Sequence, residues 1–88
     1  MKIQHRAPLD ALSVSPFQAK AALQLAGMLE AVEAYMADPA TDPIVRLAWQ
    51  HASEYKRQSP TVLAMAAHFG WTEAQLDQLF VTASGIVA

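Results

Sequence analysis

The sequence has no cysteine, only three glycines and few charged residues, which make up 16% of its 88 positions. Without cysteine the chain has no disulfide framework and no thiolate metal site, which suits an intracellular or virion protein. The glycines, at positions 27, 70 and 85, are isolated from one another. A glycine-rich phosphate-binding loop is therefore excluded.

Long apolar runs are also missing. No stretch approaches the roughly 18 uncharged apolar residues that a membrane span needs. The first residues, MKIQHRAP, are basic but are not followed by the apolar segment of a secretory signal. We therefore expect no membrane partner and no signal peptide.

Positive charge is scarce as well. Six Lys and Arg residues are set against eight Asp and Glu, which gives a net charge of -2, and no Lys or Arg follows Arg57. A protein that binds nucleic acid through phosphate contacts usually has the opposite balance. The charge balance argues against a nucleic-acid partner.

Alanine and other apolar residues dominate what is present. Apolar residues number 47, of which 18 are alanine, so 29 side chains are large enough to fill a core. Alanine is the best helix former, whereas the β-branched and aromatic residues that favour strands are few. The composition predicts one small all-α domain.

Capping signals divide the chain into four helices. Ser15, Asp42 and Ser59 each precede a proline, and Thr72 opens the sequence TEAQ, which is a capping box. Stops follow at Asp38-Pro39, Gly70 and Gly85. We predict a compact bundle of about four short helices with an extended N-terminal arm at residues 1–14, a helical domain at 15–84 and a short apolar tail at 85–88.

A helical projection predicts which faces are buried. In the first helix, residues 15–38, Leu23 falls outside the apolar stripe, and Gly27 suggests close approach of another backbone. In the second helix, Arg57 is predicted to lie on the side opposite the apolar face, near the end of the helix. The predicted apolar faces comprise Phe17, Ala21, Leu25, Met28, Leu29, Val32, Tyr35 and Met36 in the first helix, Ile44, Ala48, His51 and Tyr55 in the second, and Leu76, Leu79, Phe80 and Ala83 in the fourth.

Residues 62–81 have the spacing of a helix-turn-helix, with small and apolar residues at the packing positions and Gly70 at the turn. The second helix of this unit presents Glu73 and Asp77 where contacts to DNA are required. Two carboxylates repel a polyanion. The pattern therefore favours a packed helical hairpin over a DNA-binding unit, although a small regulator stays an alternative.

Catalytic chemistry has little to build on. His5, His51 and His68 are the only side chains that titrate near neutrality, and no cysteine nucleophile exists. His51 and Glu54 are neighbours on the predicted second helix, but no third ligand has matching spacing for a metal. We expect a non-enzymatic protein with no catalytic residues, no metal and no cofactor.

The apolar residues exceed what four short helices can bury. Trp is enriched at protein interfaces because it buries much area with few rotors, and an N-terminal segment without a helix start is ordered mainly when something holds it. We predict protein contacts through the arm, Leu23, the two tryptophans and the tail. The candidate interaction residues are Ile3, Arg6, Leu9, Leu12, Leu23, Trp49, Trp71, Val81, Ile86 and Val87.

Residues 17–80 contain FQAKAALQLAGMLEAVEAYMA, IVRLAWQHASEYKRQSP and LAMAAHFGWTEAQLDQLF. In these runs the chain resembles small helical proteins encoded among the tail and tail-fibre genes of tailed bacteriophages and prophages. The resemblance implies a phage setting, in the virion or the host cytoplasm, with tail or fibre proteins, or further copies of this chain, as partners. It transfers no catalytic residue. We therefore predict a structural or accessory phage protein, with an assembly chaperone as the nearest alternative.

Overall fold

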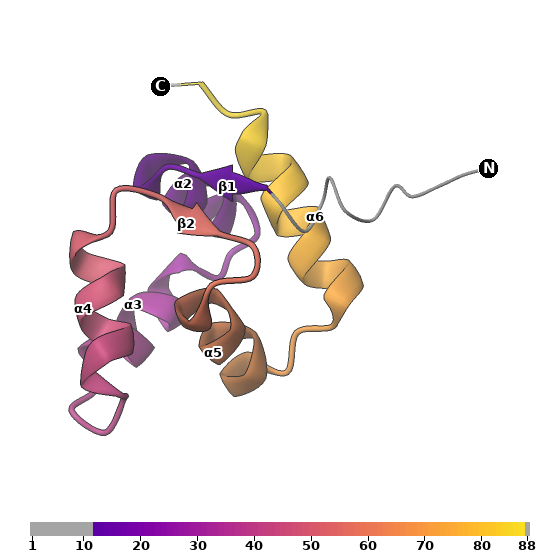
Figure 1. Ribbon diagram of the computed structural model, residues 1–88. Helices are drawn as coiled ribbons and strands as arrows, with labels where there is room; N and C mark the ends of the chain where they lie inside the picture. Colours follow the sequence, from indigo (N-terminus) through magenta and orange to yellow (C-terminus); the bar gives the residue numbers. More distant parts are fainter. Residues whose placement is uncertain (1–11, 88) are drawn as a thin grey trace.

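Residues 12–87 are described in a computed structural model, and they form five α-helices and one two-stranded sheet (Figure 1). The predicted helical class is confirmed in its broad form. The number of helices is higher than predicted because the first predicted helix is two. The elements in chain order are β1 (Ser13–Val14), α2 (Pro16–Leu25), α3 (Leu29–Ala37), α4 (Pro43–His51), β2 (Tyr55–Lys56), α5 (Pro60–Phe69) and α6 (Glu73–Ser84).

The four predicted helix starts are confirmed. The Ser15 and Thr72 hydroxyls accept hydrogen bonds from the backbone N–H groups of Gln18 and Gln75, and the two glutamine side chains bond back to the cap N–H groups. Asp42 and Ser59 cap α4 and α5 in the same manner, without the reciprocal bond. These caps depend only on local sequence, since each satisfies N–H groups of the first helical turn.

Gly27 separates α2 from α3, so the prediction of one helix over residues 15–38 is wrong. Its φ of +73° lies in the left-handed region that favours glycine. The backbone N–H of Met28 returns to the carbonyl of Leu23 across this turn. No atom lies within 4 Å of the position a Cβ would take, so Gly27 serves the turn and not a close backbone approach.

The break changes the buried face of α2. Leu23 is 5% exposed and belongs to the core, whereas Phe17 and Leu25 are exposed. The prediction projected residues 15–38 as one continuous helix with one buried face. Because Gly27 interrupts this helix, α2 and α3 each bury a face of their own. The predicted exposure of Leu23 is therefore wrong, and so is the predicted burial of Leu25.

The second predicted helix ends six residues early. α4 ends at His51, Ala52 is extended, and Tyr55 lies in β2, which pairs antiparallel with β1 through Ser13 opposite Lys56 and Val14 opposite Tyr55. Val45 and Trp49 are the buried residues of α4, whereas Ile44 and His51 of the predicted apolar face are exposed. The strand pairing accounts for the difference, because it removes Tyr55 and Arg57 from the helix.

Helices α5 and α6 follow the predicted bounds. Gly70 ends α5 in the left-handed conformation, with φ of +70°. α6 lies along α2, α4 packs against α5 and α3, and strand β1 of the small sheet lies beside α6 (Figure 1). The core draws on every element and comprises Val14, Ala22, Leu23, Val32, Met36, Val45, Trp49, Tyr55, Val62, Met65, Leu76, Phe80 and Ala83.

Candidate functional site

A solvent-open groove of about 400 Å³ lies between the C-terminal end of α2 and one side of α6. We call it the α2–α6 groove. Its apolar walls are Ala22, Leu25, Ala26, Met28, Trp71 and Leu79, and its polar residues are Gln75, Gln78 and Thr82. None of the lining residues carries a charge. The groove is therefore an apolar surface with an uncharged polar edge.

The turn at Gly27 creates one wall of the groove. Because α2 stops after Leu25, this side chain projects from the helix end and is 74% exposed. Met28 follows the turn and is partly buried against the core. An exposed leucine alone has little meaning, but one placed at the edge of an apolar depression marks a surface suited to a partner.

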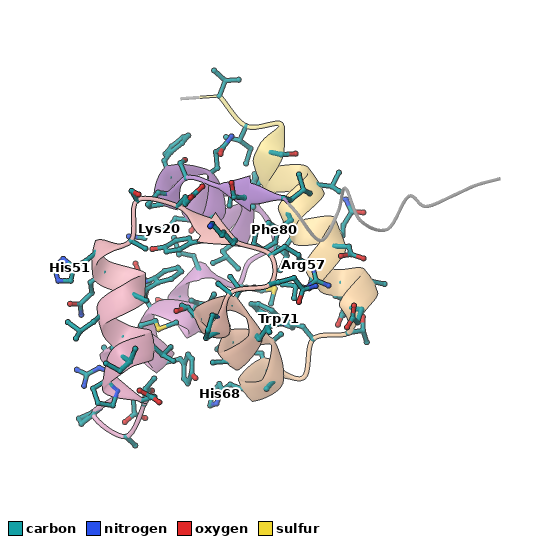
Figure 2. The ribbon with its side chains drawn as sticks, viewed as in Figure 1. Lys20, His51, Arg57, His68, Trp71 and Phe80 are labelled. Atoms are coloured by element: carbon teal, nitrogen blue, oxygen red, sulfur yellow. The ribbon has the colours of Figure 1, made fainter. Side chains whose placement is uncertain are left out.

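Trp71 forms the other wall and is held firmly. Its backbone N–H donates to the carbonyl of Ala66 across the Gly70 turn, and its ring stacks on Phe69 with centroids 5.4 Å apart. Figure 2 shows Trp71 between α5 and α6. A tryptophan packed on one side and open on the other is a typical anchor for a bound apolar group.

At the polar edge of the groove, one amide atom of each glutamine is already hydrogen-bonded within the chain. The Gln75 side-chain oxygen accepts the Thr72 N–H at 2.8 Å as part of the capping box, and Gln78 Nε2 donates to the Thr82 hydroxyl at 3.3 Å. The Gln75 Nε2 and the Gln78 Oε1 have no partner within residues 12–87. The Gln75 Nε2 donor group and the Gln78 Oε1 acceptor are therefore available on α6, three residues apart in sequence.

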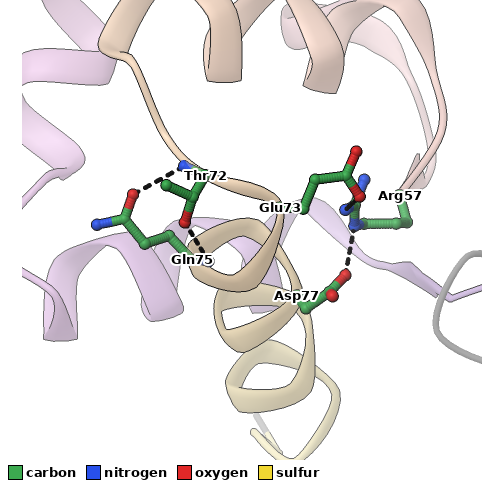
Figure 3. Close-up of polar contacts among 5 residues, drawn as sticks. All are labelled: Arg57, Thr72, Glu73, Gln75 and Asp77. Carbon is green, nitrogen blue, oxygen red and sulfur yellow. Dashed lines mark hydrogen bonds and ion pairs between the residues drawn. The ribbon is translucent and has the colours of Figure 1, made fainter. Parts of the chain in front are cut away.

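Arg57 fixes α6 from the opposite side. Its side chain is 1% exposed, and its Nε donates to Asp77 Oδ1 at 2.9 Å and its Nη2 to Glu73 Oε1 at 3.3 Å. Figure 3 shows this ion-pair cluster and Gln75 on opposite sides of α6. Arg57 thereby holds the helix in the orientation that turns Gln75 and Gln78 toward the groove.

Sequence reasoning placed Arg57 on a solvated face at a helix end, and that prediction is wrong. The chain forms β2 instead, and the Arg57 backbone N–H donates to the Leu12 carbonyl, which carries the side chain inward. One signal was available in the sequence. Glu73 and Asp77 are four residues apart and so share one helix face, where a single arginine can bond to both carboxylates.

Trp49 centres a second cluster, on the far side of the core. Its Nε1 donates to Glu33 Oε1 at 2.9 Å, its ring is parallel to Tyr55 at 5.2 Å, and Lys20 Nζ lies 5.3 Å from its centroid. The Tyr55 hydroxyl donates to the Trp49 carbonyl. A shallow cleft of about 290 Å³ opens here. Because Trp49 is buried and internally bonded, this cluster is structural.

Burial, and secondarily the nearby Glu33 carboxylate, raises the pKa of the Tyr55 phenol above its ordinary value of 10.0. The folded state therefore holds this proton more tightly than the unfolded state, and the resulting stability is complete below about pH 10 and is lost as pH rises through the folded pKa. In urea unfolding followed by circular dichroism, we expect the wild type to lose stability above about pH 10 more steeply than Tyr55→Phe. Equal slopes would contradict this assignment.

The predicted interaction residues are not gathered at one place. Val81 and Val87 are exposed, whereas Leu23 and Trp49 are buried in the core. Leu12, Trp71 and Ile86 are partly buried against the core, and of these three Trp71 lines the groove. Ile3, Arg6 and Leu9 lie outside the described residues. Sequence reasoning missed Leu25, Gln75 and Gln78, because their exposure depends on the Gly27 break and the rotation of α6.

The predicted arm and tail are partly drawn into the fold. Val14 is buried and Ser13 pairs in the sheet. Ile86 packs on the core, and its carbonyl accepts the Gln18 Nε2 at 3.1 Å. Val87, the last described residue of the tail, is 88% exposed.

Metal ligands do not cluster in residues 12–87, where no group of three or more His, Asp or Glu side chains is suitably arranged. His51 is exposed and points outward from α4 (Figure 2). His68 stacks on Tyr35 with ring centroids 4.1 Å apart. Within the same range, each helix is too short or too polar to cross a membrane.

The groove is the concave surface that best fits a binding role. Comparisons with protein-family models, curated proteins and solved structures find no match for this chain. What the groove can bind is therefore inferred from the residues that line it.

Proposed function

We propose that this chain is a non-enzymatic bacteriophage protein that docks on tail or tail-fibre components, or on its own copies, through the α2–α6 groove. The observation that carries the proposal is the groove, in which Leu25 stands exposed beside a rigid Trp71. The phage setting comes from the sequence resemblance of residues 17–80.

The physical argument is one of surface energy. Apolar surface removed from water contributes about 25 cal/mol per Å², and an uncharged groove can be covered without desolvating an ion. A contact of this small size is weak when single. In a symmetric assembly, repeated contacts add through effective concentration, so a small domain can be held firmly.

An assembly chaperone is the nearest alternative, and it would use the same groove but leave before the particle is mature. A helix-turn-helix regulator has less support. The α5–α6 pair retains the Gly70 turn, but Glu73 and Asp77 of α6 hold Arg57, and a phosphate at that helix face would meet two carboxylates.

Leu25→Glu tests the docking surface. In cells that produce particles from the encoding genome, we expect this variant to be recovered in purified tails at least tenfold less than the wild type, because a carboxylate at the edge of the groove opposes burial. Mass spectrometry of the purified particles measures the recovery. Leu63→Glu, at an exposed position of α5, is the matched control and should be recovered normally.

Three outcomes separate the hypotheses. Equal recovery of both variants would contradict the groove as the docking surface. Presence with unassembled tail proteins but absence from mature particles would identify a chaperone. Salt-sensitive binding of the purified protein to duplex DNA would favour the regulator.

A further inference from the structure

We propose that the α2–α6 groove binds an extended, uncharged peptide segment of a partner protein, with aliphatic side chains directed into the groove. This inference rests on the proposed docking function and specifies the chemistry of the partner. Three observations support it: the uncharged lining, the apolar pair Leu25 and Trp71, and the amide groups of Gln75 and Gln78.

The lining selects against charge. A charged group entering the groove would lose water and find no counterion, because the lining residues are uncharged and the acidic side chains of α6 face Arg57 on the other side (Figure 3). Aliphatic groups meet no such penalty. The volume, about 400 Å³, is in the range of pockets that hold several side chains or one small ligand.

The two glutamines select for an extended backbone. Gln75 offers Nε2 as a donor and Gln78 offers Oε1 as an acceptor, since their other polar atoms are bonded to Thr72 and Thr82. Residues three apart on a helix are neighbours, with Cβ atoms about 5–6 Å apart. A residue in an extended strand presents its own N–H and C=O to the same side. The glutamine pair therefore matches one residue of an extended chain.

A helical occupant fits this edge poorly. The N–H and C=O groups within a helix are already bonded to one another, so they would leave the two glutamine groups unused. A second copy of this chain could offer residues 1–11, MKIQHRAPLDA, but that segment carries Lys2, Arg6 and Asp10. The tail of a second copy is uncharged, but its Ile86 is packed on its own core, which leaves too little of the described tail to enter as an extended segment. The uncharged groove therefore favours a neutral segment of a different protein.

The test uses a library of capped seven-residue peptides in which threonine alternates with valine, isoleucine, leucine, phenylalanine or methionine. The purified full chain is immobilised, bound peptides are sequenced, and the affinities of labelled hits are measured by fluorescence anisotropy. We expect hits that bind the wild type and Leu63→Glu equally and bind Leu25→Glu at least tenfold more weakly. Lysine or glutamate at the central aliphatic position should also weaken binding at least tenfold.

Scanning N-methylation of the best peptide tests backbone recognition. Methylation removes one N–H and keeps the side chains, so at one position we expect at least a tenfold loss of affinity. In Gln78→Leu that loss should fall below threefold, because the acceptor is gone. Gln75→Glu removes the donor while its carboxylate still accepts the Thr72 N–H, so binding should weaken without a lower melting temperature.

A flat methylation scan, a helical bound peptide by circular dichroism, or tighter binding of the peptide MKIQHRAPLDA would each overturn the inference. So would the absence of hits. If the library fails while Leu25→Glu is still lost from particles, the inference fails and the docking function stands. If the library binds but the protein is absent from tails at every stage, the proposed phage function fails and the peptide site stands.

Discussion

Arg57→Met is expected to lower the free energy of unfolding by about 3 kcal/mol, because it removes a buried guanidinium together with both of its ion pairs. Asp77 is the partner affected more, since its side chain is 13% exposed, whereas Glu73 is 77% exposed and stays hydrated. Urea unfolding followed by circular dichroism measures the change.

Two further variants define the cause. Glu73→Gln should change stability by less than about 0.5 kcal/mol, since exposed ion pairs contribute little. Asp77→Leu in the Arg57→Met background should recover most of the loss, because apolar replacement of a whole buried pair is often close to neutral. A loss below about 1 kcal/mol in Arg57→Met alone would show that Arg57 does not anchor α6.

Trp49→Ala is expected to cost about 3–5 kcal/mol, the usual range for deleting a buried aromatic side chain. The variant loses the parallel contact with Tyr55 and the hydrogen bond to Glu33, and it leaves a cavity beside Tyr55. Thermal and urea unfolding report the loss directly.

Trp49→Phe tests how much of the loss comes from removing the aromatic ring. It keeps an aromatic ring beside Tyr55 but loses the Nε1 bond to Glu33, which is exposed and regains water, and one ring of the indole, so a cost well below that of Trp49→Ala is expected. Ile44→Ala on the exposed side of the same helix should cost less than about 0.5 kcal/mol. Similar losses in Ile44→Ala and Trp49→Ala would contradict the burial assigned to α4.

The starts of four of the five described helices, all but α3, were predictable because their causes are local. A cap at Ser15, Asp42, Ser59 or Thr72 requires only the next three residues. The apolar face of α6 was predictable for a similar reason, since no turn interrupts its period. The turn at Gly27 breaks the helical periodicity on which the projection relied. The projection therefore predicted Leu23 exposed and Leu25 buried, which is the reverse of what the structure has.

The groove and the Arg57 cluster depend on contacts between distant segments. β1 and β2 have two residues each, too few to produce an alternating pattern, yet their pairing decides that Arg57 lies inside. The groove in turn requires α2 to stop at Leu25 and α6 to present Gln75 and Gln78. Sequence periodicity does not carry this information, because the strand pairing and the packing of α6 are fixed by partners far along the chain.

The packing of α2 along α6 has a consequence for how the chain folds. These are the first and last helices of the described residues, so the most extensive helix pair joins segments that are far apart in sequence. Contacts between segments so far apart in sequence raise the contact order and slow folding relative to a bundle of sequential neighbours. During synthesis, α2 must wait for α6 to leave the ribosome before its apolar face is covered.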